Sequence, residues 1–202
     1  FVALGVDPGK VTVTGNLKYD NLVQKARDLR EELGIPEGAW VFAAASTHEG
    51  EEELILDAFG AVRSRAPQAR LLLIPRRPER ARAILDLARR NGFDACLGSA
   101  PASNAGVLVV DTMGDIPACC RTADAVFVGG SLVPFGGHNV IEPASFARPV
   151  VIGPYHHNFR SVVADFLARD AILIVQDGEE LRKTVGHLHD DREWAKAMGL
   201  RA

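Results

Sequence analysis

The sequence has few cysteines, no long hydrophobic run and almost no net charge. Its three cysteines, Cys96, Cys119 and Cys120, form no CxxC motif and do not have the spacing of metal ligands. A small and odd number of cysteines fits a protein of the reducing cytoplasm. We expect all three to be small buried residues. No apolar run reaches about 18 residues, which argues against a membrane-spanning helix. With 23 basic and 26 acidic residues the net charge is −3, so the chain lacks the electrostatic footprint of a nucleic-acid-binding protein.

The length of 202 residues and the hydrophobic content of 47% fit one domain with an ample core. The first ten residues lack the basic start and long apolar stretch of a signal peptide, and no Met opens the chain. We therefore expect the N-terminus to be an excised boundary, with residues 1–35 as an extension or junction. No internal repeat and no low-complexity segment is found.

Short apolar runs alternate with longer amphipathic stretches along the chain. The apolar runs are residues 40–45, 70–74, 107–111, 125–128, 149–152 and 171–175. The helical patterns are residues 21–32, 49–65, 78–91, 114–122, 139–147, 158–168 and 178–189. Strands without polar alternation are typical of a parallel sheet that is buried on both faces. The order of the elements predicts an α/β fold with a doubly wound, Rossmann-like parallel sheet.

Ligands of doubly wound folds bind at the carboxyl ends of the strands, which here selects the loops after residues 45, 74, 111, 128 and 152. The loop after residue 128 is the most informative, because it contains the glycine pairs Gly129-Gly130 and Gly136-Gly137 before a helical pattern. Glycines allow a ligand to approach the backbone, and a helix N-terminus offers free N–H groups to an anion. Glu142, near that helix start, is placed to bind hydroxyl groups such as those of a ribose.

Five motifs in the same order resemble those of 3-deoxy-D-manno-octulosonic acid (Kdo) transferases. They are TGNLKYD at 14–20, AASTHEGEE at 44–52, PRRPER at 75–80, DTMGD at 111–115, and a segment with GGSL at 129–132, GGHN at 136–139 and EPA at 142–144. The family's third motif reads PRHPER, so Arg77 departs from it where a His is usual. Together the motifs span most of the chain, and four of the five lie at strand ends.

This resemblance implies a glycosyltransferase that transfers Kdo from CMP-Kdo to a lipid A precursor in lipopolysaccharide biosynthesis. The family has two Rossmann-like domains in the GT-B arrangement, and this chain resembles the second, donor-binding domain. The general base and most acceptor contacts then lie in a first domain that this sequence does not contain, so no catalytic residue is expected here. The resemblance also implies the cytoplasmic face of the bacterial inner membrane, with membrane contact through the other domain, and no cofactor besides the donor substrate.

The resemblance places donor-nucleotide and Kdo contacts on fifteen residues. They are Ser46, Thr47, His48, Glu49, Arg76, Met113, Gly114, Asp115, Gly130, Ser131, Gly136, Gly137, His138, Asn139 and Glu142. In this interpretation Ser46, Thr47, Asn139 and Arg76 hold phosphate or carboxylate groups. His48 and His138 point toward phosphate or Kdo, residues 113–115 lie against the base, and Glu142 binds ribose.

Each of these loops also has a purely structural interpretation. Ser46 or Thr47 could cap a helix that starts near Glu49, and Asn139 with Glu142 three residues later approximates a capping box. The turn at 113–115 could be an ordinary glycine-containing connection, and Arg76 with Arg77 could be a solvated pair. Two glycine pairs exceed what a cap requires, and arginine suits bidentate recognition of carboxylate or phosphate.

Other site types are not supported. His156 with His157, and His187 with His189, lack nearby carboxylates at metal spacing, so we expect no metal. Residues 5–10 have one residue too few for a P-loop, and no GxGxxG follows a strand. A UDP-sugar transferase or epimerase of the same architecture stays open as an alternative. We expect the isolated chain to bind CMP without catalysis.

Overall fold

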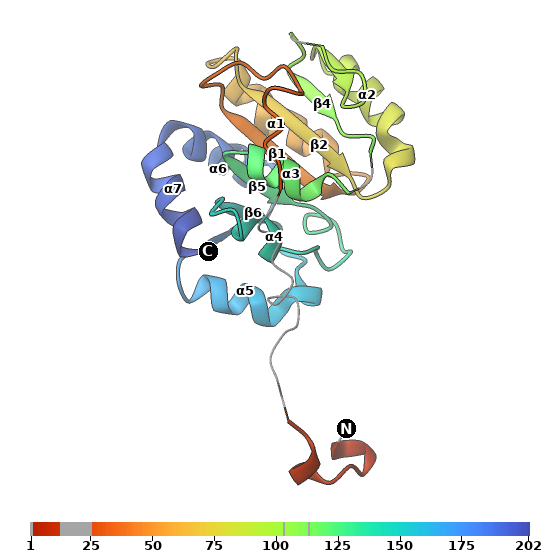
Figure 1. The fold of residues 1–202 in the computed structure, drawn as a ribbon, viewed down its shortest axis with the longest axis vertical. Coiled ribbons are helices and arrows are strands. Elements are labelled where there is room, and N and C mark those ends of the chain that lie inside the picture. The colour runs from red at the N-terminus through yellow and green to blue at the C-terminus, as the bar shows by residue number, and fades with distance from the viewer. Residues whose placement is uncertain (1, 13–25, 103, 113) are drawn as a thin grey trace.

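The structure is a computed structural model that describes residues 2–12, 26–102, 104–112 and 114–202. Seven parallel strands form one sheet in the order β3-β4-β2-β1-β5-β6-β7 (Figure 1). The chain starts at the centre with β1, moves outward to β3 and β4 on one side, and returns to the centre for β5. No helix of the described residues is long and apolar enough to cross a membrane.

The element bounds follow the predicted alternation of strands and helices. The strands are β1 (Val41–Thr47), β2 (Arg70–Pro75), β3 (Ala95–Leu97), β4 (Val107–Val109), β5 (Ala125–Val128), β6 (Val150–Ile152) and β7 (Ile172–Ile174). The helices are α1 (Glu52–Arg63), α2 (Ala81–Arg90), α3 (Ile116–Thr122), α4 (Ile141–Ala144), α5 (Arg160–Leu167), α6 (Gly178–Asp190) and α7 (Arg192–Arg201). Short 3-10 turns lie at Val2–Leu4, Pro8–Lys10, Pro78–Arg80 and His157–Phe159.

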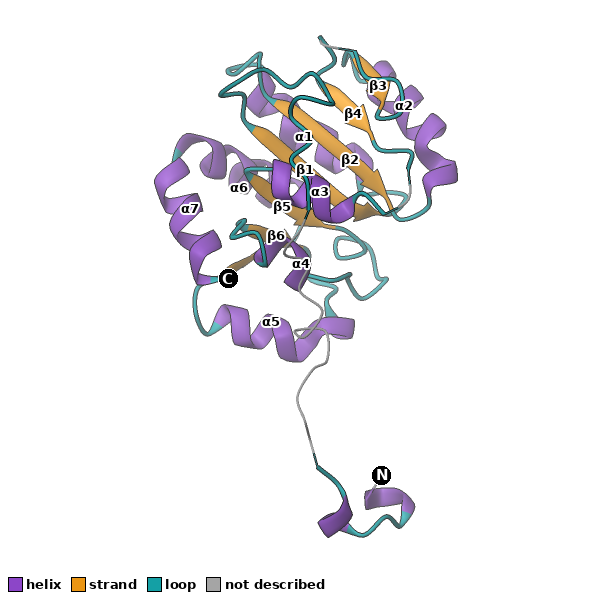
Figure 2. Ribbon diagram, in the orientation of Figure 1, coloured by secondary structure: helices purple, strands orange, loops and turns teal. Residues whose placement is uncertain are grey.

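Helices cover both faces of the sheet, as Figure 2 shows. Alternate residues of each strand point to opposite faces: Val41 and Ala43 pack with α3, α4 and α5, while Phe42 and Ala44 pack with α1, α2, α6 and α7. Side chains on both faces of β1 are buried, which explains why its sequence does not alternate between apolar and polar residues. The predicted doubly wound α/β fold is therefore confirmed.

Three local predictions differ from the structure. Residues 26–32, the described part of the predicted helix 21–32, form an extended segment and a turn. The predicted helix 139–147 is helical only at Ile141–Ala144, because Ala147 takes a φ of 53° and ends it. The short edge strand β3 and the C-terminal helix α7 were not predicted.

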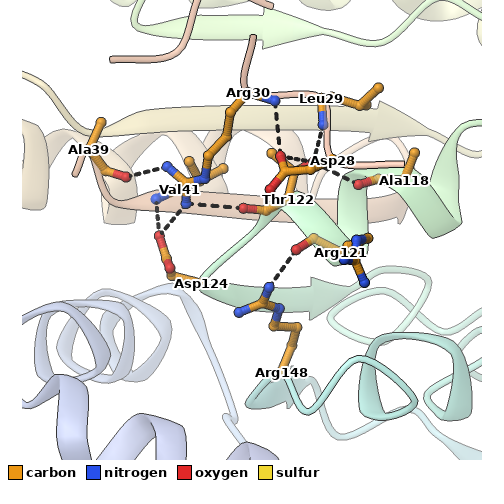
Figure 3. Close-up of polar contacts among 10 residues, drawn as sticks. All are labelled: Asp28, Leu29, Arg30, Ala39, Val41, Ala118, Arg121, Thr122, Asp124 and Arg148. Carbon is orange, nitrogen blue, oxygen red and sulfur yellow. Dashed lines mark hydrogen bonds and ion pairs between the residues drawn. The ribbon is translucent and has the colours of Figure 1, made fainter. Parts of the chain in front are cut away.

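Side chains at the amino edge of the sheet explain why residues 26–32 are not helical (Figure 3). The Leu29 N–H donates to the Thr122 hydroxyl at 2.8 Å, and the Arg30 N–H donates to the Asp28 carboxylate at 3.0 Å. The Arg30 guanidinium then binds the Ala39 carbonyl at 2.8 Å and the Asp124 carboxylate at 3.2 Å. These bonds replace helical ones, so the segment is tied to the sheet at the edge opposite the predicted ligand loops.

Candidate functional site

The candidate site lies at the carboxyl edge of the sheet, where the strand order reverses. β1 and β5 are neighbours, yet the chain leaves β1 toward β2 and reaches β5 only after β4. In parallel sheets, ligands bind in the crevice at such a switch point. The loop at residues 46–51 and the loop at residues 129–140 follow β1 and β5 and therefore lie next to each other at this switch point.

A buried carboxylate joins these two loops. Glu51 is fully buried and its Oε2 accepts hydrogen bonds from the N–H groups of His48 at 2.9 Å and Gly130 at 2.8 Å. Its Oε1 accepts from the N–H groups of Ser131 at 3.0 Å and Leu132 at 2.9 Å. The N–H groups of Gly130 and Ser131 are thus engaged by the protein itself.

Glycine is required where the two loops touch. A Cβ on Gly129 would lie 2.5 Å from the Ser46 carbonyl oxygen and 2.7 Å from the Thr47 Cα, and Ser46 itself takes a φ of 57°. The Ser131 hydroxyl accepts from the Gly153 N–H at 2.8 Å and donates to the Val128 carbonyl, which joins the ends of β5 and β6. The predicted contact residue Ser131 is therefore fully buried.

Two predicted histidines meet above Gly130. The Nε2 atoms of His48 and His138 lie 2.8 Å apart, and the rings are nearly parallel, with an interplanar angle of 6°. Phe135, which is 58% exposed, stacks on a face of the His48 ring with ring centroids 4.0 Å apart. One Nε2 must donate and the other accept, so the pair holds one proton between two neutral rings. It can therefore take up a further proton beside an anion.

The environment of the pair favours neutral rings. Burial lowers the pKa of His138 to about 4, helped by His48 and by the positive charge of Arg76. Burial also lowers the pKa of His48, against the opposing effect of the carboxylates of Glu51 and Glu52.

This shift predicts that the chain becomes less stable in acid. The folded His138 binds a proton only near pH 4, whereas the unfolded residue binds it near 6.5. The contribution of the neutral His138 ring to the free energy of unfolding is therefore complete above pH 6.5 and is lost as the pH falls toward 4. We expect a loss of about 1 to 2 kcal/mol, after allowance for partial exposure of the ring to solvent. Urea unfolding at several pH values should show a shallower decline in His138→Gln than in wild type and in the control His157→Gln; equal declines in all three would contradict the assignment.

The second glycine pair shapes the end of the loop. Gly136 and Gly137 take φ values of 91° and 78°, which side chains rarely adopt. Asn158 fixes this turn, because its Nδ2 donates to the Phe135 carbonyl at 3.0 Å. A Cβ on Gly136 would lie 2.5 Å from that Nδ2 atom. The predicted roles of the two glycines stay predictions, but their conformations explain why glycine occurs there.

Free polar groups gather where this loop enters α4. The N–H groups of His138, Asn139 and Val140 make no hydrogen bond within the described part of the chain. The Asn139 Oδ1 accepts from the Ile141 N–H at 3.2 Å, but Val140 holds the cap position of α4 and no described bond joins the Asn139 N–H to Glu142, so the suggested capping box is not formed. Glu142 is half-buried, burial raises the pKa of its carboxyl, and no described group donates to it. These free donors and this free carboxylate can bind an anion and hydroxyl groups.

A basic pocket adjoins the histidine pair. It measures about 170 Å³ and is lined by Thr47, His48, Glu49, Arg76, Arg77, Arg80 and Phe135. Thr47 is fully buried, and its Oγ1 has no hydrogen-bond partner among the described residues. Arg80 binds the buried carboxylate of Glu52 with two bonds of 2.7 and 3.2 Å, so its charge is compensated. Arg76 is exposed and forms no ion pair within the described chain, which leaves it available to an anion.

The predicted base-binding loop lies further along the sheet edge. Met113 is outside the described residues. Gly114 and Asp115 follow β4, which is separated from β1 by β2. The Asp115 carboxylate accepts from the Thr112 hydroxyl and lies 3.7 Å from the Arg27 guanidinium. Neither Gly114 nor Asp115 shares a hydrogen bond or ion pair with the loops after β1 and β5.

A larger hollow of about 870 Å³ lies elsewhere, between the outer surfaces of α1 and α6. It is lined by charged side chains such as Arg65, Arg182 and Asp190, and no strand ends there. We therefore place the site at the switch point rather than in this hollow. Among the described residues, no three His, Cys, Asp or Glu side chains are close enough to hold a metal ion.

Sequence reasoning found the loops but missed Glu51, Phe135 and the Arg80–Glu52 pair. Glu51 is one of four acids between residues 49 and 53, and its spacing does not distinguish it from its neighbours. Only burial separates it from the exposed Glu49 and Glu53. The helix cap suggested for Ser46 or Thr47 is not formed, because α1 begins at Glu52 with Glu51 at the cap position.

Relatives of the chain among known proteins include Kdo transferases of several bacteria. The chain is 34% identical, over 98% of its length, to a 3-deoxy-D-manno-octulosonic acid transferase of Haemophilus influenzae, of which it covers 48%. It is 37% identical, over 82% of its length, to the protein of that name from Bordetella pertussis, of which it covers 41%. The chain thus spans less than half the length of these relatives. No protein-family model matches it.

Solved structures with a similar fold include a CMP-Kdo binding domain and a protein in complex with UDP and glucose. The C-terminal CMP-Kdo binding domain of WaaA from Acinetobacter baumannii superposes with a TM-score of 0.74 at 28% identity, covering 85% of this chain and 92% of that one. Anabaena Alr3699/HepE in complex with UDP and glucose superposes with a TM-score of 0.62 at 16% identity, covering 86% of this chain and 44% of that one. The second likeness shows the fold alone.

Proposed function

Because this chain belongs to the Kdo transferase family and matches its C-terminal domain, we propose that it binds CMP-Kdo at the loops after β1 and β5. The observation that carries the proposal is the set of unpaired groups at residues 138–142. Three N–H groups that have no partner in the described part of the chain precede a half-buried carboxylate that likewise has none there. A nucleotide offers complementary groups, since its phosphate accepts hydrogen bonds and its ribose hydroxyls donate them.

In this proposal each free group has a role at the donor. The N–H groups of residues 138–140 bind the CMP phosphate and stabilise the charge that develops as CMP leaves. Glu142 accepts from the ribose hydroxyls. Arg76 and the His48–His138 pair face the Kdo carboxylate, where a charged and planar guanidinium is a suitable partner.

The full-length protein is proposed to transfer Kdo to a lipid A precursor at the cytoplasmic face of the inner membrane. A hydroxyl of the acceptor attacks the anomeric carbon while CMP departs, and the general base and the membrane contact come from the other domain of the family. We keep the expectation from the sequence that the donor substrate is bound here without a metal or cofactor. The isolated chain is then a donor-binding half-site.

Amide chemical shifts test where the nucleotide binds. Adding CMP to the 15N-labelled chain should move the resonances of His138, Asn139 and Val140 most, because their N–H groups gain an acceptor. Resonances along α6 should stay in place and provide an internal control. Shifts confined to the hollow between α1 and α6 would contradict the proposed site.

A further inference from the structure

Glu51 stands out because its charge has no basic partner. The side chain is fully buried, and among the described residues no Lys, Arg or His forms an ion pair with it. Its two oxygens instead accept four backbone N–H groups at 2.8 to 3.0 Å. Burying a carboxylate is costly unless hydrogen bonds replace the water that it loses, and these four N–H groups supply such bonds.

Three of these N–H groups come from consecutive residues, Gly130, Ser131 and Leu132. Gly130 takes a φ of 66°, which lets the successive amides point toward the same carboxylate. Converging amides form a concave anion-binding site, of the type that holds phosphates in many glycine-rich loops. Here the anion inside is a carboxylate of the protein, and the fourth N–H, from His48, belongs to the opposite loop.

We propose that Glu51 is a positioning residue that acts as an internal counter-anion. It fills the amide concavity of residues 130–132 and ties the loop after β5 to the loop after β1. The Gly130 carbonyl also accepts from the Gly137 N–H at 2.8 Å, so fixing Gly130 also fixes the turn before His138. Glu51 thereby sets the 2.8 Å approach of His48 and His138.

One consequence concerns the donor and rests on the proposed function. The amides of the first glycine pair are occupied, so the phosphate of the donor binds the free N–H groups of residues 138–140 instead. Glu51 acts on binding only through the loops, because it is buried beneath them and does not touch the ligand.

Removal and replacement of the anion test this role. In Glu51→Ala we expect CMP affinity to fall at least about tenfold, since the loops lose four charge-assisted bonds. Formate added at constant ionic strength should enter the vacated concavity and restore affinity. It should also return the amide resonances of Gly130, Ser131 and Leu132 toward their wild-type positions. Glu53→Ala, an exposed acid two residues away, serves as the matched control and should bind CMP as wild type does.

Two results would overturn the inference. One is a Glu51→Ala chain with wild-type CMP affinity and unmoved amide resonances. The other is a loss of CMP affinity in Glu51→Ala that formate restores no better than chloride does at the same ionic strength. If Glu51→Ala does not fold, Glu51→Gln provides the test, because a glutamine amide has only one acceptor oxygen. One of two pairs of amide resonances should then move: Ser131 with Leu132, or His48 with Gly130. If neither pair moves, the inference is wrong. The recovery of the amide resonances by formate can be followed without nucleotide, so it stands apart from CMP titration of the wild type, which tests the proposed function.

Discussion

Replacing Glu142 with glutamine lowers the affinity of the chain for CMP about 10- to 100-fold. The carboxylate is half-buried and has no partner among the described residues, so it is free to accept hydrogen bonds from the ribose. Hydrogen bonds to a charged group contribute about 1.5 to 3 kcal/mol, and each 1.4 kcal/mol is a factor of ten in affinity. Glutamine keeps the shape of the side chain but loses the charge, which separates binding from packing.

Calorimetric titration with CMP measures this effect. Ser145→Ala is the matched control, because Ser145 is exposed, follows Glu142 by three residues, and its hydroxyl donates to the Glu142 backbone carbonyl at 2.7 Å rather than to the carboxylate. In the full-length enzyme, Glu142→Ala should abolish detectable Kdo transfer. Unchanged CMP affinity in Glu142→Gln, or normal turnover in Glu142→Ala, would remove Glu142 from the site.

Replacing Gly129 with alanine destabilises the chain by about 3 kcal/mol, at the upper end of what overpacking costs. The new methyl group would lie 2.5 Å from the Ser46 carbonyl oxygen, 2.7 Å from the Thr47 Cα and 2.8 Å from the Glu51 Oε2. Two of these atoms are backbone atoms of the central strand β1, which cannot move aside without disturbing the sheet. In a chain of this size the melting temperature should fall by roughly 6 to 12 °C.

Gly186→Ala offers a control of opposite sign. Gly186 lies inside α6, and a Cβ there would meet only the end of the Arg65 side chain at 3.5 Å. Alanine in a helix interior is favoured over glycine by about 0.5 to 1 kcal/mol, so this variant should be slightly more stable than wild type. Thermal unfolding of both variants checks the pair. A Gly129→Ala chain as stable as wild type would show that the two loops are not in close contact.

Periodicity predicted the sheet because its strands are buried on both faces. β1 and β2 are fully buried along their whole length, so their apolar runs stand out in the sequence. β3 was missed because Ala95–Leu97 is a three-residue edge strand without a β-branched residue. α7 was missed because its apolar face is weak, although Asp191 caps it by accepting from the Trp194 N–H at 2.9 Å.

The segment before β1 shows how tertiary contacts override a local pattern. Residues 26–32 have a helical pattern, but Thr122, which is distant in sequence, accepts the Leu29 N–H. The Arg30 guanidinium is likewise held by the Ala39 carbonyl and by Asp124. No local signal announces these partners, so the helix prediction failed where the segment meets the sheet.

The site, like the fold, was predicted in part. The switch-point rule and the glycine pairs led to the correct edge of the sheet, because loop position follows from topology. Which polar group is free does not follow from the sequence. Gly130 and Ser131 were predicted to face the donor, yet their N–H groups bind Glu51, whereas those of Asn139 and Val140 have no partner within residues 2–12, 26–102, 104–112 and 114–202.

Nucleotide selectivity tests the central claim most directly. We would titrate this chain calorimetrically with CMP, UMP and UDP under identical conditions. A donor site for CMP-Kdo predicts that CMP binds more tightly than both uridine nucleotides. Tighter binding of UDP would contradict the account and assign the chain to a UDP-sugar enzyme of the same fold.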